Sequence, residues 1–160
     1  MPANAPKATC LCLLIRVTED GRRQLLLGVK KRGFGMGRLV APGGRLEPGE
    51  SALEATVREV REESGLTVAP EDLHEAGRIA YRFPARPEWD LTITVFTAAR
   101  FSGEPEPSDE LDPAWHDVAT VDYAAMWDDA RHWLPRVLAG ERVDALITFA
   151  ADNTTVATVA

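Results

Sequence analysis

The order of strand and helix signals along the chain predicts an α/β fold with a mixed β-sheet. Runs rich in Leu, Ile and Val alternate with two helical segments, but not in the strict strand–helix order of an all-parallel sheet. The chain has 160 residues, of which 45% are hydrophobic, and this is enough to bury one core. We therefore expect residues 1–160 to form a single domain, with helices packed on the sheet.

The predicted strands begin near the start of the chain. Ala8–Val17 reads as a buried strand, and a turn signal at Glu19–Gly21 separates it from a returning strand at Gln24–Val29. A glycine-rich stretch, residues 33–49, follows, and it suits a backbone that turns tightly or approaches a ligand closely. The remaining strands are expected at Gly77–Phe83, Leu91–Phe101, Ala114–Val118, Asp144–Phe149 and Thr154–Val159.

Two helices are predicted, and the first has the clearer local signals. Ser51 and Glu54 match a capping box, in which the Ser51 hydroxyl accepts from the Glu54 amide and the Glu54 side chain reaches back. Gly65 can end this helix in a left-handed conformation. The stripe expected to face the core consists of the apolar residues at i, i+4 and i+7: Leu53, Val57 and Val60. A second helix is predicted over Asp128–Leu138.

Composition narrows the class of partner. The net charge of −7 argues against a nucleic-acid polymer, but small phosphates stay possible because metal ions can mask both sets of charges. No apolar run has membrane-spanning length, and the start, MPANAPKATC, lacks the regions of a signal peptide. We therefore expect a cytoplasmic protein. Cys10 and Cys12 are expected to be buried thiols; metal binding is the alternative, although no His or Cys partner lies nearby.

Three glutamates, Glu59, Glu62 and Glu63, occupy positions i, i+3 and i+4 of the first helix. They fall within an arc of roughly 100° beside the apolar stripe. Like charges at these spacings destabilise a helix by about 0.2–0.5 kcal/mol per pair. A solvated acidic face is one interpretation, and such a face is expected to be exposed and to carry little packing. The acids crowd one side after a Gly-Gly loop, however, and converging oxygen ligands suit Mg²⁺, which keeps waters and bridges substrate phosphates.

The spacing around these glutamates resembles a known family signature. The segment GRLEPGESALEATVREVREESGL, from Gly44 to Leu66, matches the Nudix box, G-x5-E-x7-R-E-U-x-E-E-x-G-U with U apolar, at every specified position. So many fixed positions in a short window are very rarely matched by chance. By this resemblance the chain is identified as a member of the Nudix superfamily. The resemblance implies an α/β/α sandwich, in which the box forms a loop–helix–loop over a mixed sheet.

The resemblance also implies roles for the matching residues. The implied metal ligands, for Mg²⁺ with Mn²⁺ as a substitute, are the carbonyl of Gly44 and the carboxylates of Glu59, Glu62 and Glu63. Glu50 and Arg58 resemble a pair that braces the loop against the helix. In the implied chemistry, water attacks a phosphorus of the diphosphate, the metals stabilise charge on the phosphate oxygens, and a glutamate orients or deprotonates the water. Glu59 and Glu63 are therefore catalytic candidates.

Outside the box, the chain resembles the oxidised-purine nucleoside triphosphatases, the eukaryotic-type relatives of MutT that cleanse the nucleotide pool. The segments that keep the order and spacing of that subgroup are Lys30–Gly35, Ser108–Glu110, Met126–Trp127 and Trp133–Pro135. The resemblance implies that Glu110, in an acidic loop at residues 103–110, is a further metal ligand or a candidate base; a solvated loop charge is the alternative. The residues expected at the substrate are Thr9, Lys30, Phe34, Val40, Tyr81, Phe83, Trp127, Asp129 and Trp133.

Five of these residues are aromatic and would wall a pocket for the base. Stacking of a base on aromatic rings is worth about 1–3 kcal/mol per base. The alternative is that the rings are ordinary core residues. Lys30 would approach the phosphates, or else be a surface lysine.

Two positions depart from the pattern of this subgroup. The subgroup reads the purine through an Asn before the box, where this sequence has Val40, and through two adjacent aspartates after the tryptophan. The ungapped match aligns Asp129 with the first aspartate and Ala130 with the second, and Asp128 restores the pair only with a one-residue shift of the helix start. Val40 cannot exchange hydrogen bonds with a base edge, so discrimination between bases should weaken.

Three functions are compared on these grounds. The leading one is Mg²⁺-dependent hydrolysis of an oxidised or modified purine nucleoside triphosphate, such as 8-oxo-dGTP, to the monophosphate and pyrophosphate. The second is Nudix hydrolysis of a dinucleoside polyphosphate or a nucleotide sugar, which Val40 and Ala130 favour. The third is a non-enzymatic Nudix-like sensor or scaffold, a class that usually loses box glutamates. We expect a monomer or homodimer that binds a small nucleotide, and neither a nucleic-acid polymer nor a membrane.

Overall fold

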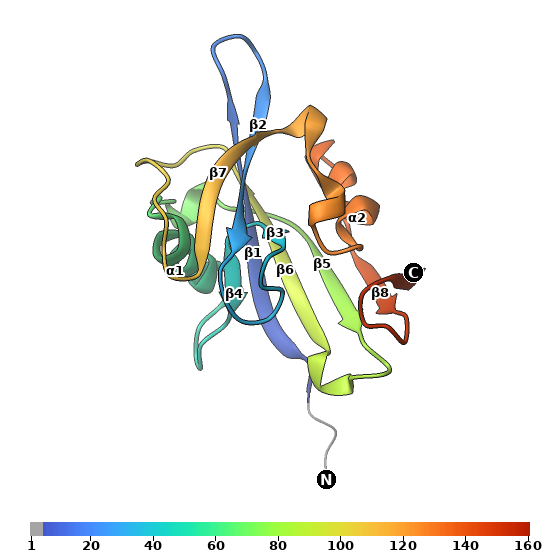
Figure 1. Ribbon diagram of the computed structural model, residues 1–160. Helices are drawn as coiled ribbons and strands as arrows, with labels where there is room; N and C mark the ends of the chain where they lie inside the picture. The colour runs from blue at the N-terminus through green and yellow to red at the C-terminus, as the bar shows by residue number, and fades with distance from the viewer. Residues whose placement is uncertain (1–4) are drawn as a thin grey trace.

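A computed structural model describes residues 5–160 (Figure 1). Residues 1–4, which belong to the predicted domain and to the N-terminal segment interpreted above, lie outside this range. The strands are β1 (Lys7–Val17), β2 (Arg23–Lys30), β3 (Leu39–Val40), β4 (Gly43–Arg45), β5 (His74–Arg82), β6 (Leu91–Ala98), β7 (Leu111–Asp117), β8 (Ala145–Phe149) and β9 (Val156–Val159). The α-helices are α1 (Ala52–Ser64) and α2 (Ala130–Leu138), and short 3-10 helices cover Pro70–Asp72, Pro87–Trp89, Val118–Thr120 and Tyr123–Ala125. Within residues 5–160, no helix is long and apolar enough to cross a membrane.

The strands form one mixed sheet, as predicted. The order is β3-β2-β1-β6-β5-β8-β9, while β4 pairs with β1 and β7 pairs with β2. β1 runs parallel to β6 and β5 runs parallel to β8, whereas the other pairs are antiparallel. The parallel pairing of β1 with β6 places the N-terminal strand in the middle of the sheet.

Alternating residues of the central strands supply two cores, one on each face of the sheet. In β1, Leu13 packs in the core that includes α2, whereas Cys12 and Leu14 pack in the core that includes α1. Successive side chains of a strand point to opposite faces, so the continuous apolar run Leu25–Leu27 serves both cores. Figure 1 shows α1 and α2 on opposite sides of the sheet, which confirms the sandwich. Cys10 and Cys12 are both buried and free, as predicted.

Helix α1 begins and ends as predicted, and the predicted stripe packs on the core, but the most deeply buried positions lie to one side of it. Ser51 and Glu54 form the capping box, and Gly65 ends the helix with a left-handed φ of 79°. The buried positions are Ala55, Thr56, Val60, Glu63 and Ser64. Leu53 and Val57 are only half-buried at the margin of the core. The stripe is shifted because α1 packs on β4 as well as on β1, which turns part of its acidic side inward.

Several element boundaries differ from the prediction by two or three residues. Strand β6 ends at Ala98 and not at Phe101, β7 begins at Leu111 and not at Ala114, and β9 begins at Val156 and not at Thr154. Two further differences, at α2 and β5, have identifiable reasons. Helix α2 begins at Ala130, because the carboxylate of Asp128 instead accepts the backbone N–H of Val156 at 2.8 Å, outside the helix. Strand β5 begins at His74, because its pairing with β6 continues past a bulge near Gly77. The later helix start leaves Asp128 facing the closing hairpin, so it does not restore the aspartate pair of the subgroup.

Candidate active site

Helix α1 and strand β4 bring two predicted carboxylates against a glycine backbone. Glu63 is only 7% exposed, and its Oε1 accepts a hydrogen bond from the N–H of Gly43 at 2.8 Å. The carboxylate of Glu59 lies against Gly44, where an added Cβ would come within 2.8 Å of the Glu59 Cδ. An added Cβ on Gly43 would come within 2.2 Å of the Cys10 carbonyl oxygen. Both glycines are therefore required by close approach of neighbouring groups.

Burial of Glu63 corrects the expectation that the whole carboxylate face is exposed. The pKa of Glu63 is raised from 4.5 to about 7, mainly by loss of hydration. The charges of Glu59 and Glu110 also raise it, whereas the hydrogen bond from the Gly43 N–H and the charge of Lys30 lower it. Burial also raises the pKa of Glu59, against a lowering by the hydrogen bond from Arg58. The depth at which α1 packs on β4 causes both shifts.

Arg58 connects the box loop to α1, which confirms the predicted brace. Its Nε and Nη2 donate to the two carboxylate oxygens of Glu50 at 2.7 and 2.8 Å, and Nη2 also donates to the Arg45 carbonyl at 3.1 Å. The hydrogen bonds from Arg58 are the main cause that lowers the pKa of Glu50 to about 2. Through Nη1, Arg58 contacts Glu59 at 2.7 Å and Glu62 at 3.2 Å. The brace thereby positions two of the predicted metal ligands.

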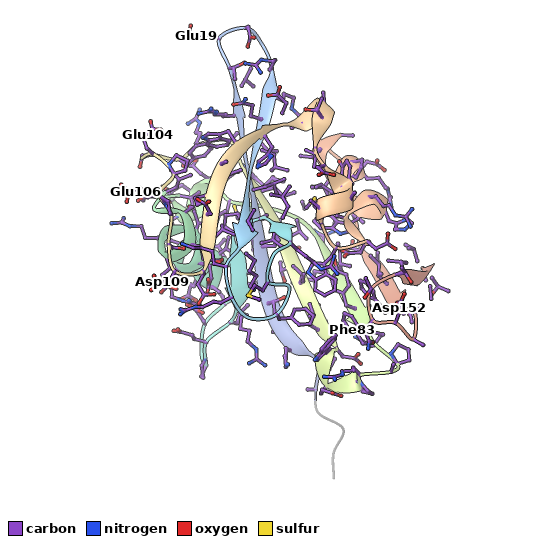
Figure 2. The ribbon with its side chains drawn as sticks, viewed as in Figure 1. Glu19, Phe83, Glu104, Glu106, Asp109 and Asp152 are labelled. Carbon is purple, nitrogen blue, oxygen red and sulfur yellow. The ribbon has the colours of Figure 1, made fainter. Side chains whose placement is uncertain are left out.

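The other predicted ligands lie nearer to solvent. The side chain of Glu62 is 58% exposed, and Glu110 is paired with Arg32 at 2.8 Å. The acidic loop that carries Glu110 lies beside α1 (Figure 2), where the N–H of Glu106 donates to the Ser64 carbonyl at 2.8 Å. Across residues 5–160, no three or more His, Cys, Asp or Glu side chains are gathered closely enough to hold an ion. The predicted ligands thus share one region without forming a closed cage.

The donor set still fits a hard divalent cation. Mg²⁺ keeps several waters and binds through one or two carboxylates together with substrate phosphates, so it needs no closed protein cage. Glu59 and Glu63 are partly removed from water, and the charge of Glu59 disfavours the charged form of Glu63. A cation beside them would offset both effects. The buried carboxylates therefore have the chemistry that a magnesium site requires.

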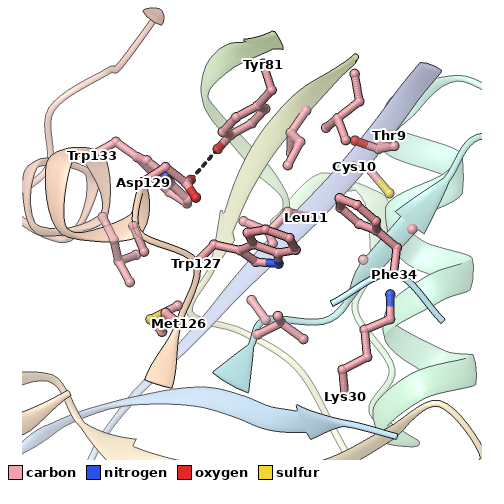
Figure 3. A pocket seen from close by; sticks show the side chains of 18 of the residues that line it. Thr9, Cys10, Leu11, Lys30, Phe34, Tyr81, Met126, Trp127, Asp129 and Trp133 are labelled. Atoms are coloured by element: carbon pink, nitrogen blue, oxygen red, sulfur yellow. Dashed lines mark hydrogen bonds between the residues drawn. The ribbon is translucent and has the colours of Figure 1, made fainter. Parts of the chain in front are cut away.

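A cavity of about 210 Å³ lies next to these carboxylates (Figure 3). It is lined by every residue expected at the substrate: Thr9, Lys30, Phe34, Val40, Tyr81, Phe83, Trp127, Asp129 and Trp133. Gly44 and Glu63 line the same cavity. The cavity and the carboxylate helix are therefore parts of one site, although residues from distant parts of the chain build them.

Stacked aromatic rings form much of the cavity wall. Phe34 and Trp127 stack with their centroids 5.0 Å apart, and Phe83 stacks on Phe149 at 4.6 Å. Phe34 is 43% exposed, so it forms the outer part of the wall. An added Cβ on Gly35 would come within 2.9 Å of the Trp127 Nε1, and the positive φ of 83° at Gly35 also favours glycine. The aromatics thus belong both to the core and to the cavity.

Asp129 is the buried carboxylate of the cavity. Its Oδ2 accepts hydrogen bonds from the Tyr81 hydroxyl at 2.7 Å and from the Trp133 Nε1 at 2.8 Å (Figure 3). Burial raises the pKa of Asp129, and both donors lower it. The polar atoms of Tyr81 and Trp133 therefore hold Asp129, so these residues offer mainly their rings to a ligand. Val40 and Ala130 also line the cavity, so both departures from the subgroup fall at the site.

Thr9 and Lys30, the two polar residues predicted at the substrate besides Asp129, have different surroundings. The Thr9 hydroxyl donates to the Thr92 carbonyl at 2.9 Å, which occupies its proton. Lys30 lies near enough to Glu63 to lower the pKa of that carboxyl. It lines the same cavity as Glu63, where a phosphate-binding lysine is expected.

Sequence reasoning missed several lining residues: Cys10, Leu11, Leu39, Met126 and Phe149. Side chains alternate between the two faces of a strand, so Phe149 would have been placed with Ile147 on the face of the sheet that α2 covers. This alternation does not reveal a cavity. Arg32 was also missed as the partner of Glu110. It lies within the glycine-rich segment, and no local pattern links that segment to the acidic loop.

Comparison with known proteins identifies the class to which this fold and site belong. The model of the NUDIX domain family matches residues 10–137, a range that contains the whole box and most residues of the cavity. The chain therefore belongs to the Nudix family, and it is a Nudix hydrolase.

Individual relatives agree with this assignment. The chain is 40% identical over 132 residues to the oxidized purine nucleoside triphosphate hydrolase of Danio rerio. This match covers 82% of this chain and 81% of the fish protein. It is 38% identical over 128 residues to the protein of the same name from Mus musculus, and the match covers 80% of this chain and 79% of the mouse protein. The crystal structure of a MutT protein from Bacillus halodurans is similar over 96% of both chains, with a TM-score of 0.78 and 25% identity.

Proposed function

We propose that this Nudix hydrolase cleaves oxidised or otherwise modified purine nucleoside triphosphates, such as 8-oxo-dGTP, to the monophosphate and pyrophosphate. One observation carries the proposal: Glu63 and Gly44 line the same cavity as Phe34 and Trp127. A nucleotide with its base among these rings would extend its phosphates towards the glutamates. The names of the fish and mouse relatives support the choice of an oxidised purine.

The proposed cofactor is Mg²⁺, with Mn²⁺ as a substitute. It would be held by the carbonyl of Gly44 and the carboxylates of Glu59, Glu62, Glu63 and Glu110. A bound divalent cation makes water a better nucleophile and stabilises charge on phosphate oxygens. Arg58 positions Glu59 and Glu62 through its contacts of 2.7 and 3.2 Å, and Lys30 supplies a positive charge for the phosphates.

Glu63 is the leading candidate for the general base, with Glu59 and Glu110 as the other two. A base must reach the attacking water and be able to accept its proton near neutral pH. Glu63 lines the cavity, and the hydrogen bond from the Gly43 N–H fixes its orientation. In this role the Glu63 carboxylate takes the proton of water as the oxygen attacks phosphorus, and the nucleoside monophosphate separates from pyrophosphate.

Asp129 is the proposed polar reader of the base. Both of its donors contact Oδ2, so Oδ1 is the oxygen through which a base would be recognised. The neighbouring positions, Val40 and Ala130, offer only apolar contact. This pocket would therefore distinguish bases through one carboxyl group and through shape.

Hydrolysis of another diphosphate compound is the second candidate, and the same two apolar positions favour it. A dinucleoside polyphosphate or a nucleotide sugar is recognised partly through its phosphates or its far end, so it depends less on hydrogen bonds to one base. Val40 and Ala130 at the cavity wall suit such a substrate.

A product assay separates the two candidates. The protein is incubated with Mg²⁺ and either 8-oxo-dGTP, dGTP, dATP, a diadenosine polyphosphate or ADP-ribose, and products are resolved by ion-exchange chromatography. The proposal expects monophosphate and pyrophosphate, with 8-oxo-dGTP turned over fastest and no turnover in excess chelator. Faster cleavage of diadenosine polyphosphate or ADP-ribose would favour the second candidate. The Glu63→Gln variant shows whether any activity comes from a contaminant.

A further inference from the structure

The glycine-rich segment after β2 and the acidic loop before β7 are joined at one residue, Glu110. Arg32 contacts its Oε1 through Nε and Nη2, each at 2.8 Å. The N–H of Lys31 donates to the Glu110 carbonyl at 2.9 Å, and the Lys31 Nζ donates to the Ser108 carbonyl at 2.7 Å. The two contacts from the Arg32 guanidinium thus fall on a single carboxylate oxygen of Glu110. The other, Oε2, accepts no hydrogen bond from the described residues, so the carboxylate is held but not saturated.

Glu110 belongs electrostatically to the carboxylate site. Its acidic loop lies beside α1, where the N–H of Glu106 donates to the Ser64 carbonyl at 2.8 Å, and in agreement with this placement the charge of Glu110 contributes to the raised pKa values of both Glu59 and Glu63. Arg32 therefore places a positive charge at the rim of a group of three carboxylates that repel one another. A divalent cation in the site and the guanidinium of Arg32 would compete for the same carboxylate.

The pair is suited to exchange because it lies in solvent. The side chains of Arg32 and Glu110 are 62% and 42% exposed, and exposed ion pairs contribute little free energy because water screens them. The neighbouring backbone bond from Lys31 to Glu110 keeps the two loops together if the side chains separate. Glu110 can thus leave Arg32 without moving away from the site.

We propose that Arg32 is a positioning residue that holds Glu110 beside the site and exchanges it with the divalent cation. This inference rests on the proposed function. In the metal-free protein, Arg32 offsets the charge of Glu110 next to Glu59 and Glu63. When a cation binds, Glu110 turns from Arg32 to the cation, and the guanidinium is released. Arg32 is therefore an internal competitor for the metal, and the competition acts only through Glu110.

The same segment links this exchange to the base cavity. Phe34 follows Arg32 by two positions and stacks on Trp127, and Gly33 and Gly35 on either side of it have positive φ angles of 78° and 83°. Release of Arg32 would remove one side-chain anchor of this segment. Cation binding should therefore loosen the segment that carries Phe34, which is measurable as faster hydrogen exchange of residues 31–37.

The test is a double-mutant cycle on metal affinity, read by the electron paramagnetic resonance of free Mn²⁺ without substrate. Arg32→Gln should tighten Mn²⁺ binding about two- to five-fold, the size expected for an exposed pair. Glu110→Gln should weaken it, and adding Arg32→Gln to Glu110→Gln should have little further effect. Arg32→Lys, which keeps the charge, should stay near the wild-type affinity. Arg22→Gln, which removes a similarly exposed arginine paired with Asp20 and Asp117, is the matched control and should change nothing.

Each contrary result has a distinct meaning. Weaker Mn²⁺ binding by Arg32→Gln would show that Arg32 only supports the loop, which overturns the exchange. If Arg32→Gln changed the Mn²⁺ affinity equally in the wild type and in the Glu110→Gln variant, the effect would be one of general charge, and the exchange would be overturned as well. In both cases, normal Mn²⁺ binding by the wild type leaves the proposed function standing. Absence of Mn²⁺ binding by the wild type would overturn the metal site and the exchange together.

Discussion

The side chain of Glu63 accepts a hydrogen bond from the backbone N–H of Gly43 at 2.8 Å, although the two residues lie on a helix and a strand. This bond fixes the carboxylate at the inner end of the site, where it lines the cavity. It also explains why a carboxylate predicted to be exposed is buried, since α1 approaches the glycine backbone of β4 closely. The role of general base proposed for Glu63 depends on this fixed orientation.

Replacing Glu63 with Gln should lower kcat by about 10²–10⁴-fold, the range for losing a positioned base or ligand. The fold should survive, because the amide oxygen of Gln can still accept the Gly43 N–H and no buried charge remains. Steady-state assays and thermal unfolding measure the two effects. Glu71→Gln, at an exposed glutamate outside the site, is the control. Wild-type kcat in Glu63→Gln would remove Glu63 from the catalytic site.

Replacing Gly44 with Ala should weaken metal binding by about 10–100-fold, the usual effect of disturbing the support of a ligand. The added Cβ would lie 2.8 Å from Cδ of Glu59, so that carboxylate has to move. The Mn²⁺ titration described above measures the affinity, and circular dichroism checks the fold. An unchanged Mn²⁺ affinity in a folded Gly44→Ala protein would mean that Glu59 is not a ligand in this position.

Asp129 should contribute to stability as well as to recognition. Asp129→Ala removes the acceptor for two buried donors, Tyr81 and Trp133, and should lower the free energy of unfolding by about 1–3 kcal/mol. Asp129→Asn keeps a side-chain oxygen and should lose less. Urea unfolding of both variants measures the difference. Equal stability of Asp129→Ala and wild type would contradict the buried network.

Base selectivity should depend on Asp129 and Val40. With Asp129→Asn, kcat/KM for the preferred nucleotide should fall about 5–150-fold, corresponding to about 1–3 kcal/mol, with a smaller change for poor substrates. Val40→Asn adds a donor and an acceptor at the cavity wall and should raise the preference for 8-oxo-dGTP over dGTP. Val29→Asn, at an exposed strand position, is the control. If Asp129→Asn slows every nucleotide equally and Val40→Asn changes nothing, the base is not read in this cavity.

The brace between Glu50 and Arg58 should make stability fall in acid. The hydrogen bonds of Arg58 and of the Glu47 N–H lower the folded-state pKa of Glu50 from 4.5 to about 2. The contribution of this group is therefore present above pH 4.5 and is lost as the pH falls towards 2. Glu50→Gln should be less stable than wild type at neutral pH and should lose less stability between these values. A parallel decline of both proteins in urea unfolding across this range would contradict the assignment.

Much of the catalytic half of the site could be predicted because its chemistry is local. The capping box, the left-handed Gly65, the glutamate spacing and the Glu50–Arg58 brace all lie in one short segment, where helical periodicity determines which side chains are neighbours. The structure bears out the capping box, the left-handed Gly65 and the brace, whereas the metal-binding role of the glutamates stays a prediction. The substrate residues came from resemblance, and the structure places all of them around one cavity, but their roles remain predictions.

The amino-acid sequence by itself determined the Nudix box, helix α1 and most of the strands, because spacing and capping act over a few residues. Only the tertiary structure decided that Glu63 is buried while Glu62 is exposed, because the depth at which α1 packs on β4 depends on contact with distant glycines. It also decided that Arg32 meets Glu110 and that Phe149 closes the cavity beside Phe83. Those contacts join segments that are far apart in the chain. A local sequence pattern does not predict which distant segments the folded sheet brings together.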